Sequence, residues 1–419
     1  MPTIHWLGAG LSSVPGIRRL AASGRPFILW NRTLSKAQIA LDDSPGQTRE
    51  LDWAELTKAV QPGDVVVSML PADLHSRVAD LCLQRGSHFV SSSYVSPAMQ
   101  ALDAESKANG LRFVNEVGLD PGIDHLMAHA LMADYQSSGV MNPAHKHRFH
   151  SYCGGFPSQP NDFRYKFSWS PLGVLRALKT PARWIENGGE TTTDKPWKAL
   201  SSYAVNLPGG EETFQAYPNR DSIPFAKQYG FNPEFNLQTF VRGTLRLNGW
   251  AEAWQDIFAV VEDSATDENE LKLLSDSLWK EYAYDPDESD RVILHVEMTV
   301  TEGDQPVWSG AYALDEHGDS TDSAMARLVS KTVSIAVEAV LDGELPSGVS
   351  AAPSNPLTAE SWLAKLIASG ERMVCTMLSN VVPATLARQY SAEDFSRLKA
   401  PCCTAMDWIF IPAYCFAIP

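Results

Sequence analysis

Short apolar runs and amphipathic segments alternate along the first 115 residues. The apolar runs that predict strands lie at residues 3–7, 27–30, 64–70, 88–92 and 111–115. Amphipathic segments that predict helices run from Pro15 to about Gly24, from 73 to 85 before Gly86, and from 97 to 109. The run at 64–70 is continuous enough to be buried on both faces. Strand and helix alternating at this spacing predict a doubly wound parallel sheet of the Rossmann type.

The middle of the chain follows another pattern. Strands are expected at 145–153, 212–218 and 238–247. From Val292 to Val300 apolar and polar residues alternate, and a polar turn at 302–305 and a second strand at 307–314 follow, which predicts an antiparallel hairpin with one solvated face. Residues 262–290 are acidic and helix-prone, and a long helix is expected from Asp322 to Asp342, ending at Gly343. The sequence therefore predicts a second, mixed α/β domain.

These patterns divide the chain into three parts. We expect a nucleotide-binding domain at residues 1–122 and a substrate-binding, catalytic domain at 123–317, which includes a short helical insertion at about 250–290. The last part, residues 373–419, holds four of the six cysteines (Cys375, Cys402, Cys403 and Cys415) and has a strongly apolar end. A metal or oligomer contact is one interpretation of this tail. The cysteine spacings fit no zinc pattern, and we favour an appended segment without a catalytic part.

Composition narrows the class of partner. The formal net charge is -16, which disfavours nucleic acid or an anionic membrane surface as the main partner. An anionic ligand must then be bound by a local group of Arg and Lys side chains. The amino-terminal residues lack a signal-peptide pattern, no apolar run reaches the roughly 18 residues of a membrane span, and Cys82 and Cys153 are scattered. We therefore expect a cytoplasmic protein with reduced thiols. The sequence has neither a P-loop nor an H-E-x-x-H motif, so nucleotide or zinc hydrolysis is not expected.

A glycine-rich turn follows the first predicted strand. It reads Gly8-Ala9-Gly10-Leu11-Ser12-Ser13 and leads into the first predicted helix, where a pyrophosphate can approach the backbone and accept N–H bonds. Ser13, a small residue, replaces the third glycine of the usual fingerprint. The sequence predicts that Gly8, Gly10, Leu11 and Ser12 contact a dinucleotide.

The end of the second strand indicates which dinucleotide is bound. An NAD enzyme usually has an acidic residue here for the ribose 2′-hydroxyl, but the sequence is Asn31-Arg32-Thr33. Arg32 suits a 2′-phosphate, with Asn31 and Thr33 as further donors, so NADP is the predicted cofactor. Because loops at the carboxyl ends of sheet strands line the cofactor crevice, we also expect Ser68, Leu70 and Pro71 to contribute.

Six longer blocks carry a family resemblance. They lie in order at residues 92–97, 115–125, 151–155, 165–170, 217–222 and 242–246. Together they resemble the saccharopine dehydrogenases that form glutamate, over roughly residues 3–370. The resemblance implies that the helix from Asp322 returns the chain to the first domain, which residues 318–370 would complete. It also implies that Trp169 lies against the cofactor.

The resemblance implies oxidation of the secondary amine of saccharopine, a tricarboxylate. Arg220 and Arg246 would bind its carboxylates, since guanidinium suits bidentate contacts. The remaining pocket residues would be Ser93, Tyr94, Thr244 and Leu245, and Asp120 would face the amine. A base must take a proton before hydride leaves, and the candidates are Asp120, Asp124, His125 and Lys166. The two aspartates could instead only stabilise the start of the helix at Ile123, and His125 could be a plain interdomain contact.

One departure from the family leaves alternatives open. The family commonly has Pro-Tyr after the strand ending at Leu70, with the tyrosine touching substrate, whereas this chain has Pro71-Ala72. A related carboxylated polyamine, such as carboxynorspermidine, is therefore an alternative substrate. A non-enzymatic NADP-sensing protein is a third possibility, which a tricarboxylate pocket disfavours. A homodimer is plausible on general grounds.

Overall fold

The computed structural model describes residues 1–207, 209–379 and 386–389. Within these residues the first sheet has seven parallel strands in the order β15-β6-β5-β4-β1-β2-β3. The strands are β1 (Ile4–Leu7), β2 (Phe27–Asn31), β3 (Gln47–Glu50), β4 (Val65–Ser68), β5 (His88–Val90), β6 (Arg112–Val114) and β15 (Gly348–Ser350). This order places the topological switch between β1 and β4, where open α/β sheets bind ligands. The predicted fold class is confirmed.

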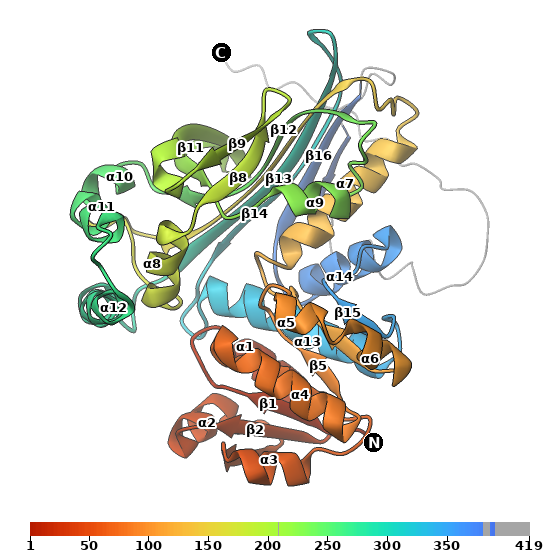
Figure 1. Ribbon diagram of the computed structural model, residues 1–419, viewed down its shortest axis with the longest axis vertical. Coiled ribbons are helices and arrows are strands. Elements are labelled where there is room, and N and C mark those ends of the chain that lie inside the picture. Colours follow the sequence, from red (N-terminus) through yellow and green to blue (C-terminus); the bar gives the residue numbers. More distant parts are fainter. Residues whose placement is uncertain (208, 380–385, 390–419) are drawn as a thin grey trace, which may run out of the picture.

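Helices cover both faces of this sheet (Figure 1). They are α1 (Val14–Ala21), α2 (Leu34–Leu41), α3 (Trp53–Ala59), the short η1 (Ala72–Leu74), α4 (His75–Arg85), α5 (Pro97–Gln100), α6 (Asp103–Ala108), α13 (Ala324–Leu341) and α14 (Pro356–Ala368). Side chains of α1, α2 and α13 pack on one face, and those of α3, α4 and α5 pack on the other. The apolar runs of the central strands are buried on both faces for this reason.

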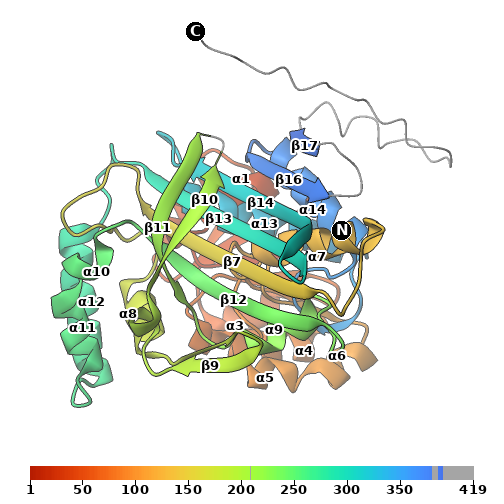
Figure 2. The ribbon, with the colours of Figure 1, turned by 90° about the horizontal axis from the view of Figure 1, so that it is seen from above.

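The second sheet is mixed and carries the site. Its strands are β7 (Lys146–Pro157), β8 (Ala182–Glu186), β9 (Gly189–Thr193), β10 (Ser201–Leu207), β11 (Gly210–Pro218), β12 (Asn236–Arg246), β13 (Asp290–Glu302), β14 (Gln305–His317), β16 (Met373–Ser379) and β17 (Leu386–Gln389). The predicted hairpin is confirmed as β13 and β14, and β7 pairs in parallel with β12. Figure 2 shows these long strands from above, with β10 and β11 at one side.

The helices of the second domain lie around this sheet. They are α7 (Ile123–Ser137), α8 (Pro171–Lys179), the short η2 (Pro196–Ala199), α9 (Ile223–Gln228), α10 (Trp250–Ala253), α11 (Gln255–Glu262) and α12 (Glu268–Tyr282). α12 begins with a capping box between Asp267 and Glu270, which explains the helical pattern predicted in the acidic segment. α7 begins at Ile123, the helix start that Asp120 and Asp124 were expected to be able to stabilise.

Some elements differ from the sequence expectations. The helix predicted at 97–109 is two short helices, α5 and α6. The patterns of further elements went unrecognised, namely α2, β3, α3, α8, β8, β9, β10, α9, β15 and α14. The predicted tail begins with residues that the structure describes. Residues 373–379 form β16, paired antiparallel with β14, and Met373 and Cys375 are buried. The low charge density of residues 373–379 is therefore explained by their place in a partly buried strand. The rest of the predicted tail lies outside the described residues, apart from β17.

The chain crosses between the domains after β14, when α13 returns to the first domain. Gly16 of α1 donates its backbone N–H to the Ser330 hydroxyl of α13 at 2.8 Å. A Cβ on Gly16 would lie 2.3 Å from the Ser330 carbonyl oxygen, so only glycine permits this close approach. β15 then pairs with β6. We propose on these contacts that residues 318–370 complete the nucleotide-binding domain.

Candidate active site

The glycine-rich turn lies at the switch between β1 and β4. Gly8 has a φ of 100°, and a Cβ there would lie 2.9 Å from the Met69 carbonyl oxygen of the neighbouring strand end. Asn31 at the end of β2 fixes the turn, because its Oδ1 accepts the Ala9 N–H at 3.1 Å. Gly10 is exposed, and a Cβ there would meet nothing within 4 Å. The turn therefore presents an open backbone at the start of α1, as a pyrophosphate requires.

The end of β2 fits a 2′-phosphate better than a free ribose hydroxyl. Arg32 and Thr33 are exposed, and within the described part of the chain no salt bridge occupies Arg32. Asn31 Nδ2 donates to the Thr33 carbonyl at 2.9 Å, so its amide holds the loop from both ends. An unpaired, exposed guanidinium and the lack of an acid at this place are what NADP requires.

A cavity lies between the turn and the second domain. It has a volume of about 250 Å³, and Leu11, Phe167 and Ser168 are among its lining residues. Leu11 is half exposed, and Trp169 next to Ser168 is 37% exposed. This places Leu11 close to the block that contains Trp169. Ser68 at the end of β4 is fully buried, while Pro71 is exposed.

The centre of the site is a buried guanidinium between two carboxylates. Arg242 of β12 has its Nη2 atom 2.7 Å from Asp120 Oδ1 and 2.6 Å from Asp124 Oδ2. Tyr94 Oη lies 3.3 Å from both Asp120 Oδ1 and the same guanidinium nitrogen. The Asp120–Pro121 peptide bond is cis, and Gly122 follows with its N–H donated to Asp124 Oδ1 at 2.6 Å. The start of α7 thus holds both aspartates against β12.

The two aspartates are not equivalent. Burial, reinforced by repulsion from Asp124, raises the pKa of Asp120 to about 6, although Arg242 opposes the rise. Burial acts in the same direction on Asp124, but His125, Arg242 and the Gly122 N–H outweigh it and lower the pKa of Asp124. Asp124 therefore stays ionised as the structural counter-ion of Arg242. Asp120 is the carboxyl that can exchange a proton near neutral pH.

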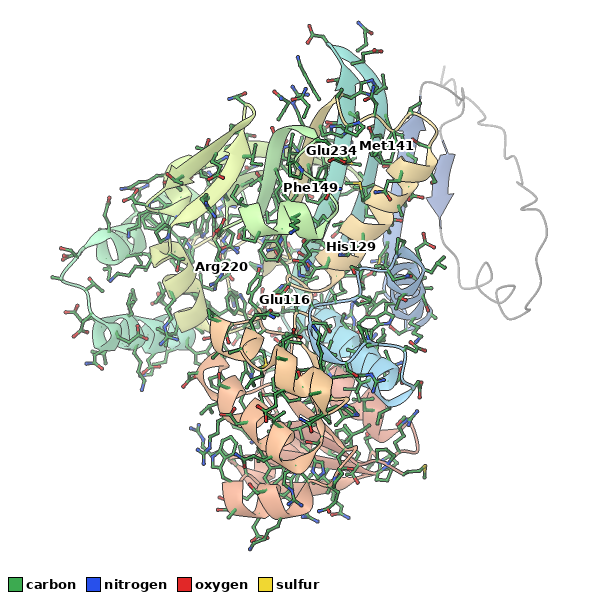
Figure 3. The ribbon with its side chains drawn as sticks, turned by 45° about the vertical axis from the view of Figure 1, so that its right-hand side comes forward. Glu116, His129, Met141, Phe149, Arg220 and Glu234 are labelled. Carbon is green, nitrogen blue, oxygen red and sulfur yellow. The ribbon has the colours of Figure 1, made fainter. Side chains whose placement is uncertain are left out.

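His125 connects this centre to the loop that carries Tyr94. His125 Nδ1 lies 2.7 Å from Tyr229 Oη, and its Nε2 lies 3.0 Å from Glu116 Oε2. The other carboxylate oxygen of Glu116 accepts the Val95 N–H at 2.9 Å. His125 is fully buried. Its contacts link residues of the two domains, and Figure 3 shows Glu116 at the junction of the domains.

A second buried guanidinium lies two strand repeats from the first. Arg246 is 6% exposed, and its charge lies 4.9 Å from the Tyr165 ring centroid, 5.3 Å from Trp250 and 5.5 Å from Tyr217. Its Nη1 donates to the Leu245 carbonyl at 3.1 Å, and its buried Nε lacks a hydrogen-bond partner. Among the described residues no carboxylate forms a salt bridge with Arg246. A buried cation without a counter-ion is the feature expected of an anion-binding site.

Two further predicted substrate residues lie close to this centre. Arg220 is exposed, adopts a φ of 58°, and lies over the Tyr94 ring at 5.5 Å, at the junction of the domains in Figure 3. Thr244 lies between Arg242 and Arg246 on the same face of β12, since alternate residues of a strand share a face. Arg220 therefore lies beside Tyr94, whose hydroxyl contacts Asp120, and Thr244 lies between the two arginines of β12.

Lys166 is the predicted catalytic residue that the structure places elsewhere. Its ammonium forms ion pairs with Glu288 and, at 3.9 Å, with Asp285, and it holds the pKa of Glu288 below its usual range. Within the described residues its salt bridges involve neither Asp120 nor Asp124. A lysine occupied by two acids at the rim of the cavity is a weak candidate for the base.

Sequence reasoning overlooked three residues of the site. Arg242 could have been recognised, because it precedes Thr244 and Arg246 by even spacings within one quoted block. Glu116 lies in the block at 115–125 and Tyr229 lies in none, but neither role could be inferred from sequence, because their contacts to His125 depend on the packing of α7 against other segments. Burial raises the pKa of Cys153, so this cysteine, expected to be reduced, remains a thiol.

The fold and the glycine-rich turn together define a two-domain, dinucleotide-dependent oxidoreductase. Comparisons with known proteins agree. A family model described as "Saccharopine dehydrogenase NADP binding domain" matches residues 4–114, and one described as "Saccharopine dehydrogenase C-terminal domain" matches residues 118–371. The chain belongs to the saccharopine dehydrogenase family, and its first domain is an NADP-binding domain. The predicted family, cofactor and enzyme class are confirmed.

Individual relatives support this membership. A saccharopine dehydrogenase [NADP(+), L-glutamate-forming] of Pyricularia oryzae is 30% identical over 429 residues, covering 84% of this chain and 94% of that protein. The mitochondrial alpha-aminoadipic semialdehyde synthase of Mus musculus is 37% identical over 205 residues, which cover 48% of this chain and 21% of that protein. The apo structure of the L-Glu forming saccharopine dehydrogenase of Saccharomyces cerevisiae has a TM-score of 0.74 at 27% identity and covers 90% of this chain and all of that one.

In the part of the chain that the structure describes, no helix combines the length and apolarity needed to cross a bilayer.

Proposed function

We propose that the protein oxidises the secondary amine of saccharopine with NADP, releasing L-glutamate and 2-aminoadipate 6-semialdehyde, or catalyses the reverse reaction. The observation that carries this proposal is the buried, aromatic-lined guanidinium of Arg246, which lacks a carboxylate partner among the described residues. A substrate carboxylate would supply the missing charge. Arg246 also shares a strand with Arg242, which holds the carboxyl of Asp120.

The surrounding residues suit a substrate with several carboxylates. Arg246 would bind one carboxylate in the depth of the pocket and Arg220 a second at its exposed edge, since guanidinium pairs with carboxylate through two parallel hydrogen bonds. Ser93, Tyr94 and Thr244 would add neutral hydrogen bonds, and the Leu245 backbone would line the wall. The protein's overall charge of -16 makes such a local group of cations necessary.

Asp120 has the position and the proton affinity of the catalytic acid–base group. With a pKa of about 6 it is mostly ionised at neutral pH and can accept the proton that the substrate ammonium must lose. NADP, when bound, accepts the hydride from the carbon next to that nitrogen. Water then adds to the resulting substrate imine, and the C–N bond breaks to give the amine and the aldehyde. Asp120 can return a proton to the leaving nitrogen.

The test compares two amines. Purified protein is incubated with NADP and either saccharopine or carboxynorspermidine, and NADPH is measured by its absorbance. The proposal expects NADPH from saccharopine and little from the polyamine, because Arg246 and Arg220 match carboxylates. Turnover of carboxynorspermidine alone would show that the substrate is a carboxylated polyamine, the alternative suggested by Ala72. NADPH binding without turnover of either amine would favour a sensor.

We further propose that the protein acts in the cytoplasm, because Cys82 and Cys153 are free thiols in the described structure. A homodimer is proposed only on the general frequency of such assemblies. Sedimentation of the purified full chain tests the dimer, and a mass of one chain at micromolar concentration would contradict it.

A further inference from the structure

A buried histidine outside the groups named so far links the cofactor edge to the substrate loop. His75, the first residue of α4, is 7% exposed. Its Nδ1 lies 2.8 Å from Ser68 Oγ at the end of β4, and its Nε2 lies 2.8 Å from Ser93 Oγ in the loop after β5. The three side chains therefore form a continuous hydrogen-bonded chain across two neighbouring strand ends.

The surroundings of His75 hold its ring in one orientation. The ring packs edge-on against Phe89 of β5, with centroids 6.2 Å apart. Ser91 Oγ lies 3.3 Å from His75 Nε2 and also accepts the Ser93 N–H at 3.1 Å. Ser93 is thus fixed through its backbone by Ser91 and through its hydroxyl by His75. Burial lowers the pKa of His75 to about 4, so the ring is neutral at physiological pH and has one N–H donor and one acceptor.

A neutral imidazole has one donor and one acceptor nitrogen, so the hydrogen bonds from Ser68 through His75 to Ser93 can run in one of two directions. If Nδ1 carried the proton, Ser93 would have to donate its own hydrogen to Nε2, and Ser93 would have none to offer a ligand. If Nε2 carries the proton, Ser68 donates to Nδ1, Nε2–H donates to Ser93 Oγ, and the Ser93 hydrogen is free to donate to a ligand. Only the second arrangement lets the half-buried Ser93 donate to an anion.

We propose that His75 is a positioning residue for substrate binding, which as the Nε2–H tautomer orients the Ser93 hydroxyl so that it donates to a substrate carboxylate. The hydrogen bonds run in one direction, from Ser68 through His75 and Ser93 to the carboxylate. This inference rests on the proposed function, because the ligand of Ser93 is the tricarboxylate amine. In this proposal His75 holds the Ser93 hydroxyl in place and takes no part in the chemistry itself.

Two conservative variants of His75 distinguish the role of Nε2 from that of Nδ1. In His75→Gln the side-chain amide nitrogen can occupy the place of Nε2 and still donate to Ser93, whereas in His75→Asn it can reach only the place of Nδ1. We expect the saccharopine KM to rise about tenfold in His75→Asn, as the loss of a hydrogen bond to a charged group implies. It should stay within about threefold of the wild-type value in His75→Gln, with kcat and the NADP KM little changed in both.

His88 provides a matched control. It is a partly buried histidine at the opposite end of β5, where its Nδ1 accepts the Arg112 N–H at 3.0 Å, and burial lowers its pKa to about 4 as well. His88→Asn should lower stability without changing the saccharopine KM. Equal KM values for saccharopine in wild type and His75→Asn, or an equal rise in both His75 variants, would overturn the proposal.

The tautomer itself is measured independently of turnover. Nitrogen-15 NMR of the histidine-labelled protein distinguishes a protonated Nε2 from a protonated Nδ1, and the spectrum of His75→Gln assigns the His75 signals by their loss. A protonated Nε2 on His75 supports the chain of hydrogen bonds, and a protonated Nδ1 refutes it. If the wild type fails to oxidise saccharopine, the proposed function fails, and the NMR result still decides the tautomer.

Discussion

The Nη2 atom of Arg242 lies 2.7 Å from Oδ1 of Asp120, so the carboxyl that faces the pocket has a buried cation behind it. The same nitrogen is shared with Asp124, which the start of α7 holds in place. Arg242 and the neighbouring Arg246 therefore have different tasks. Arg242 is balanced by the protein's own carboxylates, and Arg246 is left for the ligand.

Replacing each arginine with methionine therefore has opposite consequences. Arg242→Met leaves two buried carboxylates without a counter-ion and should lower the free energy of unfolding by about 3–5 kcal/mol. Arg246→Met removes a buried cation that has no carboxylate partner among the described residues, so stability should hold or rise, while the saccharopine KM increases about 100-fold. Urea unfolding and steady-state kinetics of both variants check this, and a marked loss of stability in Arg246→Met would contradict the assignment.

The pKa of Asp120 predicts the acid side of the pH profile. Because the carboxylate must be ionised to accept a proton, kcat/KM for saccharopine oxidation should rise with pH through about 6. Asp120→Asn should lower kcat by about 100-fold and abolish this limb, whereas Asp304→Asn, in the exposed turn between β13 and β14, should leave the profile unchanged. An unaltered limb in Asp120→Asn would assign the titration to another group.

The same shift affects stability with a definite sign. The folded-state pKa of Asp120 is raised above its unfolded value of 3.8, so the folded state binds the proton more tightly. The contribution of this group to stability is therefore present at pH below 3.8 and is lost as pH rises through about 6. Asp120→Asn should consequently be more stable than the wild type at pH 8, in contrast to its loss of activity.

Cofactor preference should depend on Arg32. Arg32→Ala should raise the KM for NADP about 30-fold and leave that for NAD nearly unchanged, since only NADP carries the 2′-phosphate. Arg25→Ala provides the control, because Arg25 lies before the opposite end of β2 and pairs with Asp342 at 2.7 Å. Parallel losses with both cofactors would contradict a 2′-phosphate contact.

Two glycines of the first helix region should respond differently to alanine. Gly16→Ala would place a Cβ 2.3 Å from the Ser330 carbonyl oxygen and should cost about 2–3 kcal/mol of stability. Gly10→Ala meets open space, so stability should be kept while NADP binds more weakly, because the added methyl group faces the pyrophosphate. Thermal unfolding and fluorescence titration with NADPH separate the two effects, and equal destabilisation would contradict the packing argument.

The parts of this structure that depend on local sequence patterns could be predicted from the sequence. The parallel sheet and the β13–β14 hairpin follow from hydrophobic periodicity. The start of α7 follows from the Asp120-Pro121-Gly122 turn, and the glycine-rich turn follows from its place between a strand and a helix. β3 and β16 were missed for opposite reasons. β3 has mostly exposed, polar residues at the sheet edge, and β16 lies in a segment whose composition resembled a tail.

The network of contacts around Arg242 and His125 could not be predicted in the same way. Its contacts join residues more than 100 positions apart, such as Arg242 with Asp120 and His125 with Tyr229. Sequence reasoning proposed four bases with equal standing, and only the three-dimensional arrangement distinguishes them. Lys166 is occupied by Glu288, Asp124 is held by Arg242 and the Gly122 N–H, and His125 lies between Tyr229 and Glu116.

The most direct test of the account is the stoichiometry of products formed from saccharopine and NADP by the purified full chain. The account predicts NADPH, L-glutamate and 2-aminoadipate 6-semialdehyde in equal amounts, because hydride leaves the carbon on the lysine-derived side of the nitrogen. NADPH accompanied by lysine and 2-oxoglutarate would show that the other side of the amine reacts. That result, or no NADPH from saccharopine at all, would contradict the proposed function.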